Sequence, residues 1–274
     1  MDVKFLGLPI KRNLKLAYSI SIIIAILMIG SSITGLLYPG QIYPSEDLVL
    51  AFMPNDIINL VIGLPILLVS MWLTSRGKLL GLLFWPGALF YVLYNYLIYV
   101  LAMPINMVSL AALILVTMSA YALIDLLARF DRTAIREALS GAVPERLAGG
   151  VLMGLGSLFM LRVMAIFIGA IINQTLLPET EKALNISDFL ISPAAVIGGL
   201  LLWQRKEMGY AVGLALLFQQ SMLFIGLIAV LALQPFMIGV PFVIFDLIVV
   251  FIMGLVCFIP FFLYARGVFP KGKI

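Results

Sequence analysis

Residues 79–102 read LLGLLFWPGALFYVLYNYLIYVLA, an uninterrupted run without a single charged side chain. At a rise of about 1.5 Å per residue, a helix of this length is long enough to cross the roughly 30 Å hydrocarbon core of a bilayer. The run therefore predicts a membrane-spanning helix. Its polar residues Tyr91, Asn95 and Tyr99 recur every four positions, which places them along one face of that helix.

Further apolar runs before and after this one predict about eight spanning helices. We place them at Leu14–Leu37, Asp56–Thr74, Leu79–Ala102, Met107–Leu127, Ala148–Ile172, Asp188–Trp203, Gly209–Leu233 and Phe242–Tyr264. The composition agrees, because 64% of the 274 residues are hydrophobic and only 11% are charged, against about 25% charged in soluble domains. The predicted fold class is all-α: a polytopic integral membrane bundle that forms one domain over residues 1–274.

Lysine and arginine are concentrated in every second predicted loop. Nearly all of the 17 therefore lie on the side of the membrane that also holds the N-terminus. Lys182, in an outer loop, and Arg162, inside a predicted helix, are the exceptions. Because short cytoplasmic loops are enriched in basic residues, we expect a multi-pass plasma-membrane protein with both termini in the cytoplasm. The net charge of +4 then reflects orientation and contact with membrane lipids, and no nucleic-acid partner is expected.

The predicted helices divide into two sets of four. The halves 1–127 and 148–274 are joined by residues 128–147, which we interpret as a cytoplasmic amphipathic linker. Asp56 is followed by glycines 21 and 25 residues later, at Gly77 and Gly81, and Asp188 by Gly209 and Gly213 at the same intervals. This spacing raises the hypothesis of a parallel internal repeat, since two sets of four helices share one orientation.

Several classes of chemistry lack the residues they need. The chain has no histidine and one cysteine, Cys257, so histidine-ligated metals, Ser-His-Asp hydrolysis and an internal disulfide are excluded for this chain alone. No P-loop or nucleophile-elbow motif occurs. We therefore predict no catalytic residue, no metal site and no cofactor, and leave open whether the protein is an enzyme.

Ionisable side chains inside predicted helices are the candidate site residues, because such groups are costly in a membrane and tend to face cavities. Arg162 is the deepest, and by depth we expect Asp246 to be its partner, either in a structural ion pair or in a ligand site. Asp56 and Asp188 fall at the predicted outer ends of their helices. They are interpreted either as N-terminal caps or as ligand-binding groups.

Neutral polar groups complete the candidate site. Asn95 is expected to hydrogen-bond to Gln219 or Gln220 on a neighbouring helix, or to line a polar cavity with Gln219, Arg162 and Asp246.

Three functions remain open. The first is a transporter, channel or binding protein for a small solute or lipid. The second is a non-catalytic subunit or scaffold, with a membrane partner or as a homo-oligomer. The third is a histidine-independent lipid-modifying enzyme that uses Asp56, Asp188 and Asp246.

Overall fold

The computed structural model describes residues 7–238 and 242–269. Most of these residues are helical and none forms a strand. Eight of the helices are long and apolar enough to cross a membrane, which confirms the prediction of about eight spans. The helices are α1 (Lys15–Leu37), α2 (Pro39–Ile42), α3 (Glu46–Ile58), the π-helix η1 (Asn59–Gly63), α4 (Leu64–Ser75), α5 (Leu79–Ala102), α6 (Met107–Ala128), α7 (Arg132–Leu139), α8 (Glu145–Asn173), α9 (Glu179–Trp203), α10 (Glu207–Ile238) and α11 (Ile244–Val268). Segments α3, η1 and α4 follow one another without a break and form one span.

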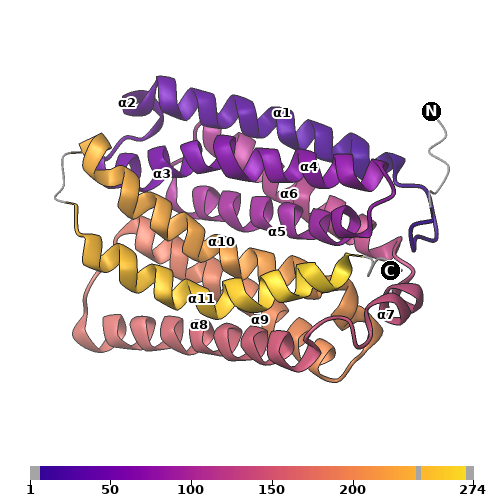
Figure 1. The fold of residues 1–274 in the computed structure, drawn as a ribbon. Coiled ribbons are helices and arrows are strands. Elements are labelled where there is room, and N and C mark those ends of the chain that lie inside the picture. The colour runs from indigo at the N-terminus through magenta and orange to yellow at the C-terminus, as the bar shows by residue number, and fades with distance from the viewer. Residues whose placement is uncertain (1–6, 239–241, 270–274) are drawn as a thin grey trace.

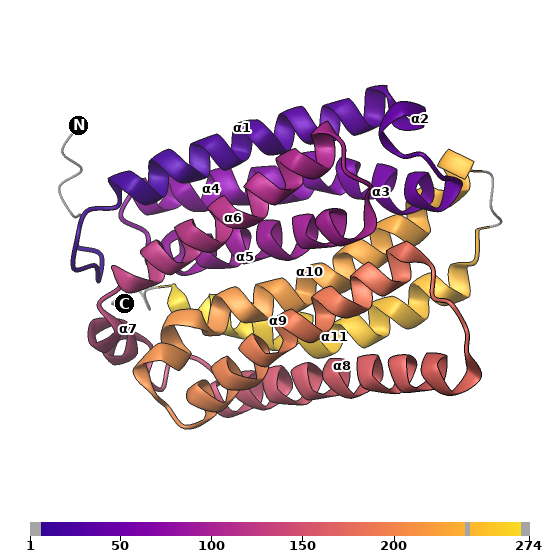
Figure 2. The ribbon, with the colours of Figure 1, turned by 180° about the vertical axis from the view of Figure 1, so that it is seen from behind.

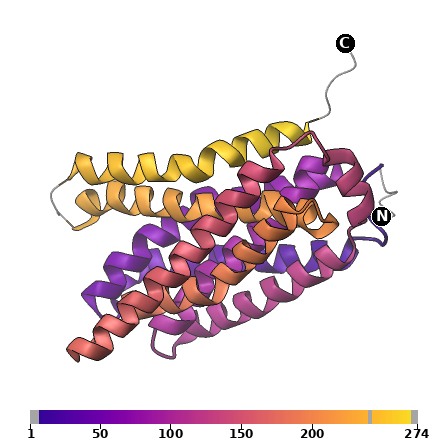
Figure 3. The ribbon, with the colours of Figure 1, turned by 90° about the horizontal axis from the view of Figure 1, so that it is seen from below.

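Helix α5 lies at the centre of the bundle and is the most buried span. It packs against α4 and α6 of its own half and against α9 and α10 of the other half, as Figures 1 and 2 show. Helix α8 is the least buried span and packs mainly against α9, whereas α10 and α11 run side by side at another edge (Figure 3). Side chains on α5 can therefore reach both halves of the molecule.

The start of α1, helix α7 and the end of α11 lie at the same end of the bundle, which we call the α7 end (Figure 1). Here Glu145 accepts hydrogen bonds from the backbone N–H of Gly141 at 2.8 Å and the Tyr210 hydroxyl at 3.0 Å. The Tyr264 hydroxyl donates in turn to the Tyr210 carbonyl at 2.9 Å. These contacts tie the starts of α8 and α10 to the end of α11.

The linker between the halves contains the short helix α7. The Asp131 side chain caps it by accepting a hydrogen bond from the Ala134 N–H at 3.3 Å. Just before it, Arg129 forms an ion pair with Asp125 at 2.6 Å, and this carboxylate raises the pKa of Arg129. Arg129 also donates to the carbonyl of Asn13, which fastens the linker to the chain that enters α1.

Two helix starts were predicted too late along the chain. The span containing Asp56 begins at Glu46, where Ser45 accepts a hydrogen bond from the Leu48 N–H, and the helix containing Asp188 begins at Glu179. The interpretation of Asp56 and Asp188 as N-terminal caps is therefore wrong. Both lie more than two turns inside their helices, which is why both are buried.

Candidate functional site

Asp56 on α3 is fully buried in the N-terminal half. Its two carboxyl oxygens accept hydrogen bonds from different tyrosines: Oδ2 from Tyr43 at 2.5 Å, and Oδ1 from Tyr99 on α5 at 2.9 Å. Gly35 of α1 lies directly against this group, because a Cβ atom at Gly35 would collide with Asp56 Oδ2 and the Tyr43 hydroxyl. The carboxyl group is thus enclosed by α1, α5 and the segment before α3.

A set of amides continues this arrangement along α5. Asn59 Oδ1 accepts hydrogen bonds from the Tyr91 hydroxyl at 2.8 Å and from Asn95 Nδ2 at 2.9 Å, and Asn55 Nδ2 donates to Asn95 Oδ1 at 2.7 Å. The predicted Tyr91–Asn95–Tyr99 face therefore meets α3 and η1. We call the whole group the Asp56 cluster; it consists of Tyr43, Asn55, Asp56, Asn59, Tyr91, Asn95 and Tyr99.

The expected partners of Asn95 were wrong, because its amide bonds to Asn55 and Asn59 rather than to Gln219 or Gln220. Both glutamines are buried in α10. Neither amide atom of Gln219 has a hydrogen-bond partner, and Gln220 Oε1 also has none. The structure therefore does not join these two candidates to the Asp56 cluster by hydrogen bonds.

The backbone beside the Asp56 cluster departs from regular α-helix. The π-helix η1 begins at Asn59, Pro54 lies inside α3, and Pro65 lies in the first turn of α4. Proline removes a helical hydrogen bond, and single-turn π-helices occur frequently at functional sites. Asp56 and Asn59 consequently lie where the span is least regular.

The C-terminal half carries a second polar group around Asp188 on α9. Arg162 Nη2 approaches Asp188 Oδ2 at 2.8 Å and Asn185 Oδ1 at 3.3 Å, while the Tyr94 hydroxyl of α5 donates to Asp188 Oδ1 at 2.7 Å. The Arg162 guanidinium also lies 5.6 Å from the centre of the Phe159 ring. We call Arg162, Asn185, Asp188 and Tyr94 the Asp188 cluster.

The two members of this ion pair differ in exposure. The Asp188 side chain is 6% exposed, whereas the Arg162 side chain is 45% exposed. Arg162 lies near the middle of α8, about 25 Å from the start of that helix. Its charge is therefore balanced by a carboxylate on one side and open to the surroundings of the bundle on the other.

The predicted pairing of Arg162 with Asp246 is wrong. Asp246 is exposed in the first turn of α11, and Arg162 pairs with Asp188 instead. The physical reason is packing, since α8 lies mainly against α9, and the longer α9 carries Asp188 into the bundle. The structure thus brings Asp56 and Asp188 into contact with α5 and leaves Asp246 outside both clusters.

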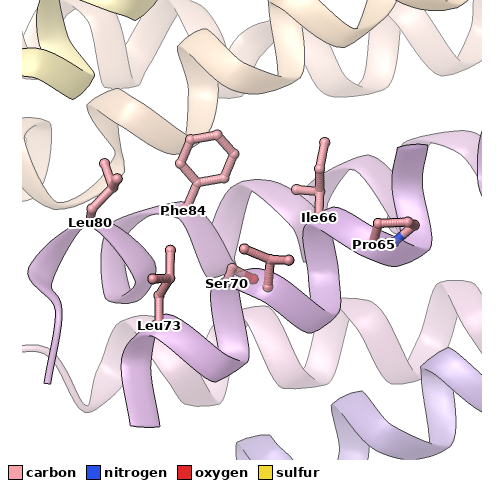
Figure 4. Close-up of a pocket in the computed structure, with 7 residues that line it drawn as sticks. Pro65, Ile66, Ser70, Leu73, Leu80 and Phe84 are labelled. Atoms are coloured by element: carbon pink, nitrogen blue, oxygen red, sulfur yellow. The ribbon is translucent and has the colours of Figure 1, made fainter. Parts of the chain in front are cut away.

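An apolar pocket of about 250 Å³ lies between α4 and α5, as Figure 4 shows. It is lined by Pro65, Ile66, Val69, Ser70, Leu73, Leu80 and Phe84. The Ser70 hydroxyl, the one side-chain polar group of this lining, donates to the Leu67 carbonyl at 2.8 Å. The lining therefore suits hydrocarbon and offers little to a polar solute.

Within residues 7–238 and 242–269, no three His, Cys, Asp or Glu side chains come together as a metal site. Comparison of the chain with family models, curated proteins and solved structures finds no match. The Asp56 and Asp188 clusters are accordingly the basis for any statement about function.

Proposed function

We propose that this protein is a transporter or binding protein for a small solute or lipid in the plasma membrane, with its polar site built around α5. The observation that carries the proposal is the pair of buried aspartates, Asp56 and Asp188, each held by a tyrosine of this one helix. Ionisable groups inside spanning helices are rare, and they mark substrate and ion pathways. The basic residues at the α7 end support a cytoplasmic location for that end.

The chemistry of the groups at this site matches a small polar solute better than a lipid tail. The Asp56 cluster presents hydroxyl, amide and carboxyl groups, and these recognise polar atoms by hydrogen bonds. The apolar pocket between α4 and α5 is the feature that favours a lipid. The experiment below therefore includes both kinds of compound.

The test is a thermal-unfolding screen of the purified full chain in lipid nanodiscs. The probes are amino acids, monosaccharides, nucleosides, short-chain carboxylates and phosphatidylglycerol, each added alone. We expect one class to raise the midpoint of unfolding in the native protein and to lose this effect in Asn59→Leu and Tyr94→Phe variants. Asp125→Asn, at the α7 end and outside both clusters, serves as the control that keeps the response.

Two results would contradict the proposal. One is a folded native protein whose midpoint no probe raises and which takes up none of the probes in proteoliposomes. The other is a stabilising compound whose effect is unchanged in both cluster variants, since this places its site elsewhere.

A second candidate function is that of a non-catalytic subunit, and the half-exposed Arg162 on the least buried span favours it. An acidic side chain from a partner helix could approach the open side of this guanidinium. Recovery of a stoichiometric membrane partner after gentle detergent extraction, lost in Arg162→Met, supports this function. The enzyme hypothesis has less support, because Asp246 stands apart from Asp56 and Asp188.

A further inference from the structure

Asp56 differs from Asp188 in having no cationic partner. Its two hydrogen-bond donors are neutral tyrosine hydroxyls, and no lysine or arginine in the described part of the chain forms an ion pair with it. A carboxylate that is removed from water and left without a cation is strongly disfavoured, so such a group takes up a proton or binds a cation.

The packing around Asp56 favours the proton. Gly35 presses against Oδ2 so closely that a single added methyl group would collide there. A metal ion requires several oxygen ligands arranged around it at coordination distance, whereas a proton requires only a neighbouring hydrogen-bond acceptor. The enclosed carboxyl group meets the second requirement without any rearrangement.

Acceptors for that proton lie next to the carboxyl group. The Ser32 hydroxyl of α1 lies close to both Asp56 and Tyr96, but outside good hydrogen-bonding geometry with either. The Tyr96 hydroxyl is likewise buried without a partner. Unpaired buried polar groups are rare in proteins, and each needs an explanation. A carboxylic proton on Asp56 gives the Ser32 hydroxyl a donor.

The titratable groups that face Asp56 are all tyrosines, namely Tyr43 before α3 and Tyr91, Tyr96 and Tyr99 on α5. Helix α1 contributes only serines and Gly35 here. Helices α9 and α10 also pack against α3. On α9, Asp188 is paired with Arg162 and Lys182 with Glu179, whereas Glu181 is exposed in the first turn. Helix α10 has no charged residue after Glu207.

We propose that Asp56 is a reversible proton-binding site, protonated in the arrangement described here, whose loss of the proton rearranges the irregular segment 54–65. Deprotonation leaves a buried negative charge one turn before η1, and the neighbouring Asn59 amide has an unpaired Nδ2 that can turn toward it. This proposal deepens the proposed function, because it names the proton as the ion coupled to solute binding. Only this coupling rests on the proposed function, and the proton site itself does not.

Infrared difference spectroscopy of the full chain in liposomes tests the proton site. Between mildly acidic and strongly alkaline buffer, we expect the carbonyl band of a protonated carboxyl group to disappear in the native protein. The band should be missing in Asp56→Asn, retained in Asp125→Asn and shifted in Tyr99→Phe, which removes one hydrogen bond. Tyr99→Phe also reports on Asp56 if Asp56→Asn does not fold. A native protein without this band, or a band that survives in folded Asp56→Asn, overturns the proposal.

Hydrogen–deuterium exchange tests the coupling to segment 54–65. After correction for the intrinsic pH dependence of exchange, we expect protection of this segment to fall at alkaline pH in the native protein and to stay constant in Asp56→Asn. Residues 108–120 of α6 serve as the internal control. An unchanged segment in the native protein overturns the coupling. Neither measurement needs a transported solute. The proton-site proposal can therefore be overturned while solute binding is confirmed, and the reverse.

Discussion

The Asp56 and Asp188 clusters accommodate a buried carboxyl group in two different ways. Both place an aspartate inside a spanning helix and hold it with a hydroxyl group from α5. Asp188 is balanced by Arg162 at the edge of the bundle, whereas Asp56 is enclosed by neutral groups in the interior. The comparison teaches that burial and available partners, rather than residue type, decide the charge that a carboxyl group carries in a membrane bundle.

The largest effect is expected from Arg162→Met, which leaves Asp188 buried without its cation. Breaking a buried ion pair from one side costs about 3–5 kcal/mol, and the 45% exposure of Arg162 puts the expected loss near the lower limit, at about 3 kcal/mol. Unfolding in mixed micelles with increasing dodecyl sulfate, followed by tryptophan fluorescence, measures this loss.

The matched control for this variant is Arg162→Met combined with Asp188→Asn. We expect the double variant to recover most of the lost stability, because the remaining amide carries no charge. A double variant as unstable as Arg162→Met alone would show that packing of the arginine side chain, rather than its charge, holds α8 to α9.

The next largest effect is expected at the enclosed cluster, from Gly35→Ala. The added methyl group meets Asp56 and Tyr43, and overpacking of this kind costs about 1–3 kcal/mol. Gly30→Ala, on the same helix with open space around the added Cβ, is the matched control and should change stability little. Equal effects in the same unfolding assay would mean that α1 does not press on Asp56.

Smaller losses of stability are expected from Tyr94→Phe and Tyr99→Phe. The order of the two losses distinguishes a charged aspartate from a neutral one. A hydrogen bond to a charged group contributes about 1.5–3 kcal/mol, and one between neutral groups about 0.5–1.5 kcal/mol. We therefore expect Tyr94→Phe, which removes a donor from the ionised Asp188, to lower the free energy of unfolding by about 2 kcal/mol, and Tyr99→Phe by about 1 kcal/mol. The reverse order would identify Asp56 as the charged member.

The smallest effect is expected from Asp56→Asn. An asparagine has nearly the shape of the protonated carboxyl group. Its Nδ2 offers a donor to the unpaired hydroxyl of Ser32 but cannot accept the hydrogen bond of one of the two tyrosine hydroxyls. Because one hydrogen bond is gained and one is lost, the change in unfolding free energy should stay below about 1 kcal/mol. A loss as large as that of Arg162→Met would mean that Asp56 is ionised and has a counter-charge.

Much of the fold could be predicted from the sequence because hydropathy reports directly on membrane-spanning length. The predicted bounds of α5 agree with the structure, and its Tyr91–Asn95–Tyr99 face meets polar partners as helical spacing implies. The parallel repeat, the single domain and the membrane orientation remain predictions.

The site was only partly predictable. Charged residues in the first turns of α3 and α9, such as Glu46 and Glu179, lower the local hydropathy, so these helices seemed to start at Asp56 and Asp188. The partner of Arg162 was chosen by depth, yet helix packing decides which side chains meet. Tyr94 lies off the predicted face and so turns toward α9, while the polar pair Asn55 and Asn59, four residues apart, was an overlooked signal.

The close pairing of α8 and α9 has a consequence for how the chain enters the membrane. Arg162 is synthesised 26 residues before Asp188, so α8 leaves the ribosome before its counter-charge exists. An arginine at the centre of an inserting helix costs about 2.5–3.5 kcal/mol on translocon-derived scales. We therefore expect α8 to remain beside the translocon until α9 emerges, so that the two helices pass into the lipid together as one hairpin.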